Sequence, residues 1–98
     1  MSFQLLVRPS AKADLRESFT WYEEQRAGLG AEFLNAVERK LAQIETHPLR
    51  FPVVRNATRR AIVLRFPYSV FYVVDGGMIS VLAVMHHARS PVHWLSRH

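Results

Sequence analysis

Cysteine is absent from this 98-residue chain, which excludes both a disulfide framework and a thiolate metal site. Long apolar runs are also missing: residues 1–8 alternate and then meet Pro9, without the stretch that a signal peptide or membrane span requires. We therefore expect a cytoplasmic protein without a membrane association. Glycine-rich phosphate loops, nucleophile elbows and zinc-ligand spacings do not occur, so we expect neither a cofactor nor a metal.

Acidic residues are scarce relative to basic ones. The chain has 13 lysines and arginines against 8 aspartates and glutamates, a formal net charge of +5. This surplus favours an acidic target, either nucleic acid or an acidic protein, and charge alone does not choose between them. With 49% hydrophobic and 21% charged residues the chain has the composition of a folded protein. Its length suits one domain over residues 1–98.

The N-terminal half predicts a strand followed by a helical hairpin. Residues 3–7 alternate, which indicates a strand that ends at Pro9. Ser10 is the expected N-cap of a first helix that runs to about Arg26. Gly28 and Gly30 are expected to take left-handed conformations that reverse the chain. The second helix should stop at residue 47, because the residue before a proline avoids helical geometry.

The C-terminal half predicts strands. After an irregular stretch over residues 48–58, apolar runs at 61–66, 70–74 and 78–85 indicate three antiparallel strands. The last run has little polar alternation, so it should be a central strand buried on both faces. The expected fold is α+β in the order β-α-α-β-β-β. The antiparallel hairpin would pack on one face of a mainly antiparallel four-stranded sheet, with the N-terminal strand at an edge.

Arginines around the second predicted strand form the first candidate site. Arg59, Arg60 and Arg65, with Arg89 beyond the last strand, could bind phosphate through bidentate guanidinium contacts. The alternative is that they are solvated edge residues that discourage strand pairing. Since residues five apart on a strand point to opposite faces, Arg60 and Arg65 should not converge.

Histidines and an aromatic pair are the other candidates. His86 and His87 follow the most buried strand and could act as a general acid or base, but adjacent strand residues face opposite ways and cannot chelate one ion. The alternative places one histidine in packing and the other in solvent. In the first helix, Trp21 lies off the apolar face and could anchor a partner, whereas Tyr22 belongs to the core.

Short motifs along nearly the whole chain resemble the RelE/ParE toxin superfamily. They are Trp21-Tyr22-Glu23-Glu24-Gln25, Gly28-Leu29-Gly30, His47-Pro48, Arg59-Arg60, Phe66-Pro67-Tyr68, Phe71-Tyr72, Ala83-Val84-Met85-His86-His87-Ala88-Arg89-Ser90-Pro91 and Trp94. The resemblance implies a toxin that a cognate antitoxin neutralises by wrapping across its surface. It implies contact with promoter DNA only through the antitoxin. RelE-like members cut messenger RNA in the ribosome, whereas ParE-like members inhibit DNA gyrase without nuclease chemistry.

Residue by residue, the resemblance favours the ParE side. Arg60 and Arg89 match basic positions of the RelE nuclease, and His87 or its neighbour could supply the proton transfer. Ile62 and Ser69, in contrast, stand where that nuclease has basic groups, and Trp94 stands near a terminal tyrosine. Missing donors at a phosphate site cost about tenfold to a thousandfold each in rate.

We therefore expect a non-catalytic, ParE-like plasmid-stabilisation toxin that inhibits growth. The alternatives are a RelE-like, metal-independent ribonuclease acting on ribosome-bound mRNA and a basic binding module unrelated to toxicity. Trp21, Arg59, Arg65, His86 and Trp94 are the expected contacts to the target or the antitoxin. Arg60, Arg89 and His87 would be catalytic only in the RelE-like case.

Overall fold

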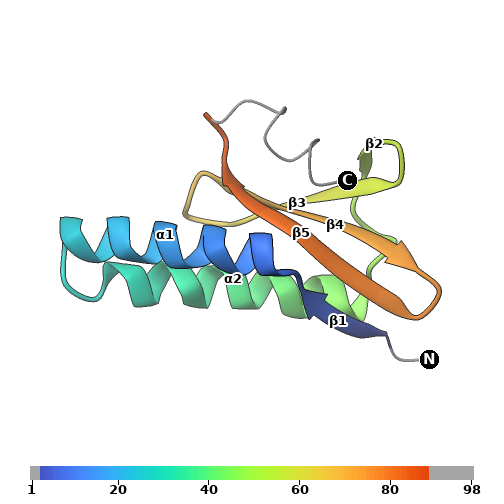
Figure 1. Ribbon diagram of the computed structural model, residues 1–98, viewed down its shortest axis with the longest axis horizontal. Helices are drawn as coiled ribbons and strands as arrows, with labels where there is room; N and C mark the ends of the chain where they lie inside the picture. Colours follow the sequence, from blue (N-terminus) through green and yellow to red (C-terminus); the bar gives the residue numbers. More distant parts are fainter. Residues whose placement is uncertain (1–2, 89–98) are drawn as a thin grey trace.

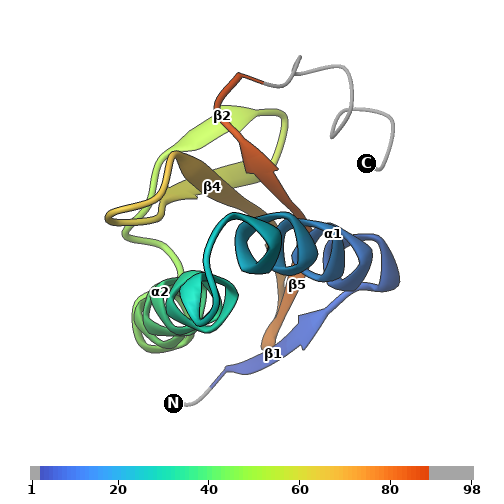
Figure 2. The same ribbon diagram turned by 90° about the vertical axis from the view of Figure 1, so that its left-hand side faces the viewer.

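The computed structural model describes residues 3–88, which fold into a helical layer and a sheet. The elements are β1 (Gln4–Val7), α1 (Pro9–Gln25), α2 (Leu29–Thr46), β2 (Val53–Arg55), β3 (Thr58–Ile62), β4 (Tyr68–Asp75) and β5 (Met78–His86). Figure 1 shows both helices running along the sheet and extending past one end of it, and Figure 2 shows them side by side when viewed along their length. The predicted α+β class and the hairpin on one sheet face are confirmed.

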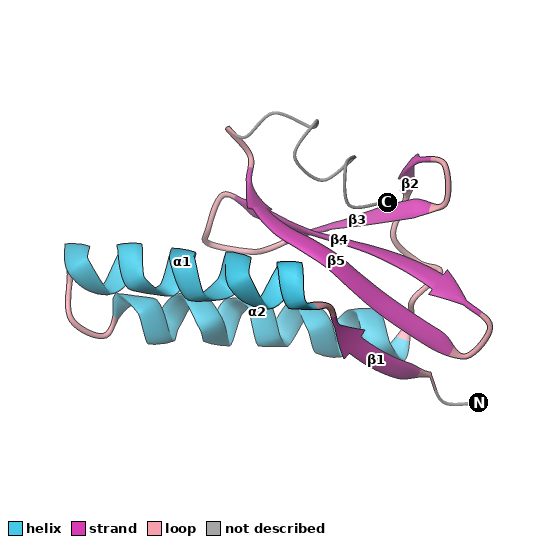
Figure 3. Ribbon diagram, in the orientation of Figure 1, coloured by secondary structure: helices cyan, strands magenta, loops and turns pink. Residues whose placement is uncertain are grey.

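The sheet has the strand order β1-β5-β4-β3-β2. β1 pairs with β5 in parallel and the other pairs are antiparallel, so the sheet is mixed. The expected edge position of the first strand and the central position of the last strand are confirmed. The expected four strands become five, because β2 forms within the stretch expected to be irregular (Figure 3). β2 is only three residues long and exposed at every residue, so it has no alternation that the sequence could reveal.

The start of α1 differs from the prediction. The helix begins at Pro9, whose fixed φ suits the first helical position, and its N-cap Arg8 makes no side-chain cap. Ser10 is therefore inside the helix, and its expected role as N-cap is wrong. Its hydroxyl instead donates to the Leu82 carbonyl oxygen of β5 at 2.8 Å.

The turn between the helices uses its two glycines differently. Gly28 has a φ of 89°, the left-handed conformation that was predicted. Gly30 lies inside α2, so the same prediction is wrong for it. A Cβ atom on Gly30 would lie 2.7 Å from Cδ2 of Phe19, which shows that this glycine permits close helix packing. The Gly30 backbone N–H donates to Oε1 of Glu23 at 2.8 Å, which satisfies one of the free amides at the start of α2.

A β-bulge in β5 decides which side chains face the helices. Phe71 pairs with Ala83 and Tyr72 pairs with Val81, so Leu82 is an extra residue in the ladder. Val81 therefore faces the helices, whereas Ala83 faces away from them. Without the extra residue, strict alternation would put both on the same face.

The main core lies between the helical hairpin and the sheet. Its largest fully buried side chains are those of Tyr72, Phe33, Ile44 and Ile79. The Tyr72 hydroxyl donates to the Pro48 carbonyl oxygen at 2.6 Å, and burial raises the pKa of Tyr72 to about 12. Within residues 3–88 neither helix is long and apolar enough to cross a membrane.

Candidate functional site

The sheet face turned away from the helices, here called the open face, carries side chains of β3, β4 and β5. Paired strand residues share a face, and every second residue returns to it. Two neighbouring rows follow from the strand register. The first row consists of Arg60, Phe71 and Ala83, and the second row consists of Ile62, Ser69 and Met85. Phe71, Ala83 and Met85 are buried and form an apolar cluster of their own, separate from the main core.

His87 reaches the second of these rows. Its Nε2 lies 3.0 Å from Oγ of Ser69, and which atom donates depends on the histidine tautomer. Ser69 is only 1% exposed, so its hydroxyl holds the imidazole in place and is not accessible as a nucleophile. The structure thus puts two of the three predicted catalytic residues, Arg60 and His87, one row apart on the open face. The third, Arg89, lies outside the described residues.

His86 points to the opposite side of β5, as alternation predicted. Its ring contacts Tyr68 edge-on at 5.2 Å between centroids, and its Nδ1 accepts a hydrogen bond from the Ala88 N–H at 3.0 Å. A small cavity of about 30 Å³ lies beside it, lined by Asp14, Glu17, Ser18, Tyr68, Val84 and His86. In the part of the chain that the structure describes, no three histidine, cysteine or acidic side chains gather as a metal site.

Neither Arg59 nor Arg65 lies on the open face. Arg59 Nη1 donates to the carbonyl oxygens of Leu49 at 3.1 Å and Phe51 at 2.6 Å, so it holds the segment that leads from α2 to β2. Arg65 lies after the end of β3, and its Nη2 is 3.2 Å from Oε1 of Glu32 on α2. The predicted separation of Arg60 from Arg65 is thus observed, and the three arginines form no single phosphate site.

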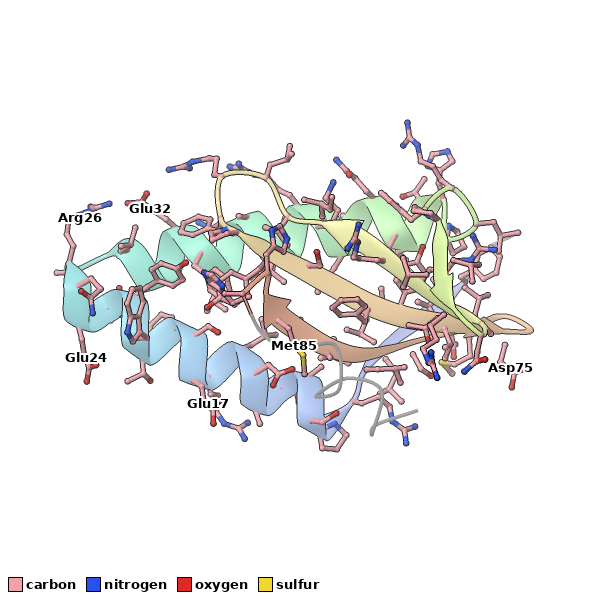
Figure 4. The ribbon with its side chains drawn as sticks, turned by 90° about the horizontal axis from the view of Figure 1, so that it is seen from above. Glu17, Glu24, Arg26, Glu32, Asp75 and Met85 are labelled. Carbon is pink, nitrogen blue, oxygen red and sulfur yellow. The ribbon has the colours of Figure 1, made fainter. Side chains whose placement is uncertain are left out.

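Glu32 is a contact that the sequence reasoning missed. Its carboxylate pairs with Arg65 and also with Arg26, whose Nη2 lies 3.2 Å from Oε2 (Figure 4). Hydrogen bonding from Arg26, followed by that from Arg65, lowers the pKa of the Glu32 carboxyl. The Arg65 contact joins residues 33 positions apart, so no local pattern could have indicated it.

Trp21 stands on the outer side of α1, as its place off the apolar stripe predicted. Its side chain is 55% exposed and meets the ring of Tyr22 edge-on at 5.0 Å between centroids. Glu17 and Glu24 flank the same shallow surface, and Figure 4 shows both projecting outward from α1. Trp94, the other predicted aromatic contact, lies outside the described residues.

Comparison with known proteins identifies a matching family and solved structures with a similar fold. Residues 5–91 match the family model described as the ParE toxin of type II toxin–antitoxin system, parDE. No curated protein sequence matches significantly. The chromosomal ParDE toxin–antitoxin system from P. aeruginosa contains a similar structure, with a TM-score of 0.79 at 17% identity, covering 87% of this chain and 96% of that one. The toxin–antitoxin complex RelBE2 from Mycobacterium tuberculosis contains another, with a TM-score of 0.63 at 21% identity, covering 89% and 100%.

Proposed function

This chain belongs to the ParE toxin family of type II toxin–antitoxin systems, and we propose that it inhibits DNA gyrase without nuclease chemistry while a cognate antitoxin holds it inactive. The composition of the open face is the observation that carries the choice of gyrase. A metal-independent ribonuclease must activate a 2′-hydroxyl, stabilise a charged phosphorane and protonate the leaving oxygen. In the two rows of the open face, Arg60 and His87 are the only side chains suited to these tasks.

The neighbouring positions support the same choice. Ile62 is 48% exposed and apolar where a second cation would help, and Ser69 is buried beneath His87. An exposed apolar side chain at Ile62 suits contact with a protein surface better than chemistry on a phosphodiester.

An antitoxin partner is supported by the family and by charge. The two similar structures come from a toxin–antitoxin system and a toxin–antitoxin complex. A chain with a net charge of +5 suits an acidic protein partner through complementary electrostatics.

Purified protein separates the two targets. We expect it to inhibit supercoiling by purified DNA gyrase and to leave mRNA intact on programmed ribosomes. Addition of the cognate antitoxin should restore supercoiling. Cleaved mRNA with unaffected gyrase would establish the RelE-like alternative instead.

His87→Gln is the sharpest variant for the same question, because glutamine keeps hydrogen-bonding capacity and loses proton transfer near neutral pH. We expect growth inhibition within about twofold of the parent, whereas a general acid–base catalyst would lose about a hundredfold or more. His47→Gln is the matched control, because it makes the same change at an exposed position at the end of α2. A loss confined to His87→Gln would favour the ribonuclease.

A further inference from the structure

α2 and the turn at residues 63–67, between β3 and β4, enclose a cleft of about 180 Å³ that the function proposed above does not use. We call it the α2 cleft. Its lining combines cationic and apolar side chains, and it consists of Ala36, Arg39, Lys40, Gln43, Leu64 and Arg65. The four α2 residues follow at helical spacing, so they form one stripe along the helix.

Lys40 is the most unusual member of this lining. The residue is only 8% exposed, and its Nζ contacts the Oε1 atom of Gln43 at 2.8 Å and the ring of Phe51 at 5.4 Å from its centroid. Neither of these two partner groups carries a negative charge. Buried cations are normally paired with an anion, because desolvation disfavours an isolated charge. The ion pairs found within residues 3–88 both belong to Glu32, so they leave Lys40 without an anionic partner there.

Two arginines add positive charge at the cleft. Arg39 is exposed and takes part in neither of those ion pairs. Arg65 has a φ of 75°, a strained conformation for a residue with a side chain, and it pairs with Glu32. Glu32 is already shared with Arg26. Three cations thus line the cleft, and the carboxylate that pairs with one of them, Glu32, is also paired with Arg26.

Apolar surface decides what kind of anion would fit. Leu64 is 66% exposed, the highest value among the large hydrophobic residues within residues 3–88, and it lines the cleft together with Ala36. A free phosphate would use only the cations and leave this surface in water. An acidic side chain on a peptide with an apolar neighbour would satisfy Lys40 and cover Leu64 together.

We propose that the α2 cleft binds an acidic residue and an adjacent apolar residue of the cognate antitoxin. The proposal rests on the function proposed above for the existence of an antitoxin, and it adds the place and the chemistry of one contact. The surplus of positive charge at the cleft, in a chain of net charge +5, complements an acidic segment.

Affinity for the purified antitoxin tests the cleft. Arg39→Glu and Leu64→Ser both change exposed side chains, so the fold should persist, and a circular dichroism melt checks this. Each should weaken antitoxin binding at least tenfold, which is about 1.4 kcal/mol. Arg55→Glu is the matched control, since it makes the same charge change at an exposed position on β2. It should weaken binding by less than about threefold. Exchange of the contacting aspartate or glutamate of the antitoxin for lysine should restore its affinity for the Arg39→Glu variant.

The possible outcomes are distinct. Equal losses in Arg39→Glu and Arg55→Glu would show a general charge effect and overturn the cleft. Normal antitoxin binding by both cleft variants would also overturn the proposal. If those variants lost growth inhibition instead, the cleft would contact the target. If they lost affinity for a DNA duplex, the cleft would be a phosphate site. If the unaltered protein binds no antitoxin, the proposed function fails as well, and that result is separate from failure of the cleft alone.

Discussion

Gly30 shows how one missing side chain allows the two helices to pack. Phe19 and Glu23 of α1 occupy the space that a Cβ atom would take, at 2.7 and 2.8 Å. The Glu23 carboxylate uses the same close approach to accept the Gly30 N–H. The close approach at Gly30 and the hydrogen bond to Glu23 thus hold the start of α2 against α1.

Gly30→Ala is expected to lower the free energy of unfolding by about 1–2 kcal/mol, although alanine is the better helix former. The reason is that the added methyl group must displace Phe19 or Glu23. Urea denaturation followed by circular dichroism measures the change. Gly77→Ala serves as the control, because a Cβ atom there meets nothing within 4 Å. Equal stability of the two variants would show that the hairpin adjusts without cost.

The bulge in β5 determines which of its side chains face the helices, and α1 contacts β5 at this point. β5 continues past the last residue that pairs with β1, Val81, and beyond that point the Val84 N–H donates to Oδ2 of Asp14 at 2.9 Å. One turn earlier on α1, Ser10 donates to the Leu82 carbonyl. α1 therefore holds both sides of the bulge, and the bulge in turn places His86 and His87 on their respective faces.

Asp14→Ala should destabilise the protein, because Asp14 is only 5% exposed and its loss leaves the Val84 N–H buried without this acceptor. We expect a decrease of about 1–3 kcal/mol in the free energy of unfolding, measured by urea denaturation. Ser10→Ala removes the neighbouring, half-buried hydrogen bond and should cost about 1 kcal/mol. A parent-like Asp14→Ala variant would show that the bulge does not depend on α1.

Positive charge is a property of the molecule as a whole. With a net charge of +5, the protein should attract an acidic partner before any specific contact forms. Charge is distributed unevenly over the surface. Two carboxylates and one guanidinium, those of Glu17, Glu24 and Arg16, line the surface at Trp21, whereas three cations line the α2 cleft.

The rate of association with the antitoxin should therefore fall with salt. Between about 0.05 M and about 0.5 M NaCl we expect the association rate constant to drop about tenfold or more, while the dissociation rate constant changes much less. Stopped-flow or surface-based kinetics would measure both constants. Arg55→Glu should reduce the salt dependence slightly, since it removes charge but no cleft contact. A rate constant independent of salt would contradict electrostatic steering.

The sequence by itself determined the order of all the elements except β2, including the two helices and the central place of the last strand. These depend on local signals: apolar periodicity, Pro9 and Pro48 as boundaries, and Gly28 as a turn. The opposite orientations of His86 and His87 also followed from simple alternation. β2 was missed because three exposed residues have no pattern.

Only the tertiary structure decided which side chains meet. The contacts of Arg59 with Leu49 and Phe51 depend on the path of the chain after α2, and the Arg65–Glu32 pair joins a strand end to a helix. The α2 cleft likewise needs Lys40 and Leu64 to approach from separate elements. Such contacts have no signature in the sequence, because packing between distant segments sets them. The bulge at Leu82 adds one residue and reverses which face the rest of β5 presents, a shift that no repeat of two can reveal.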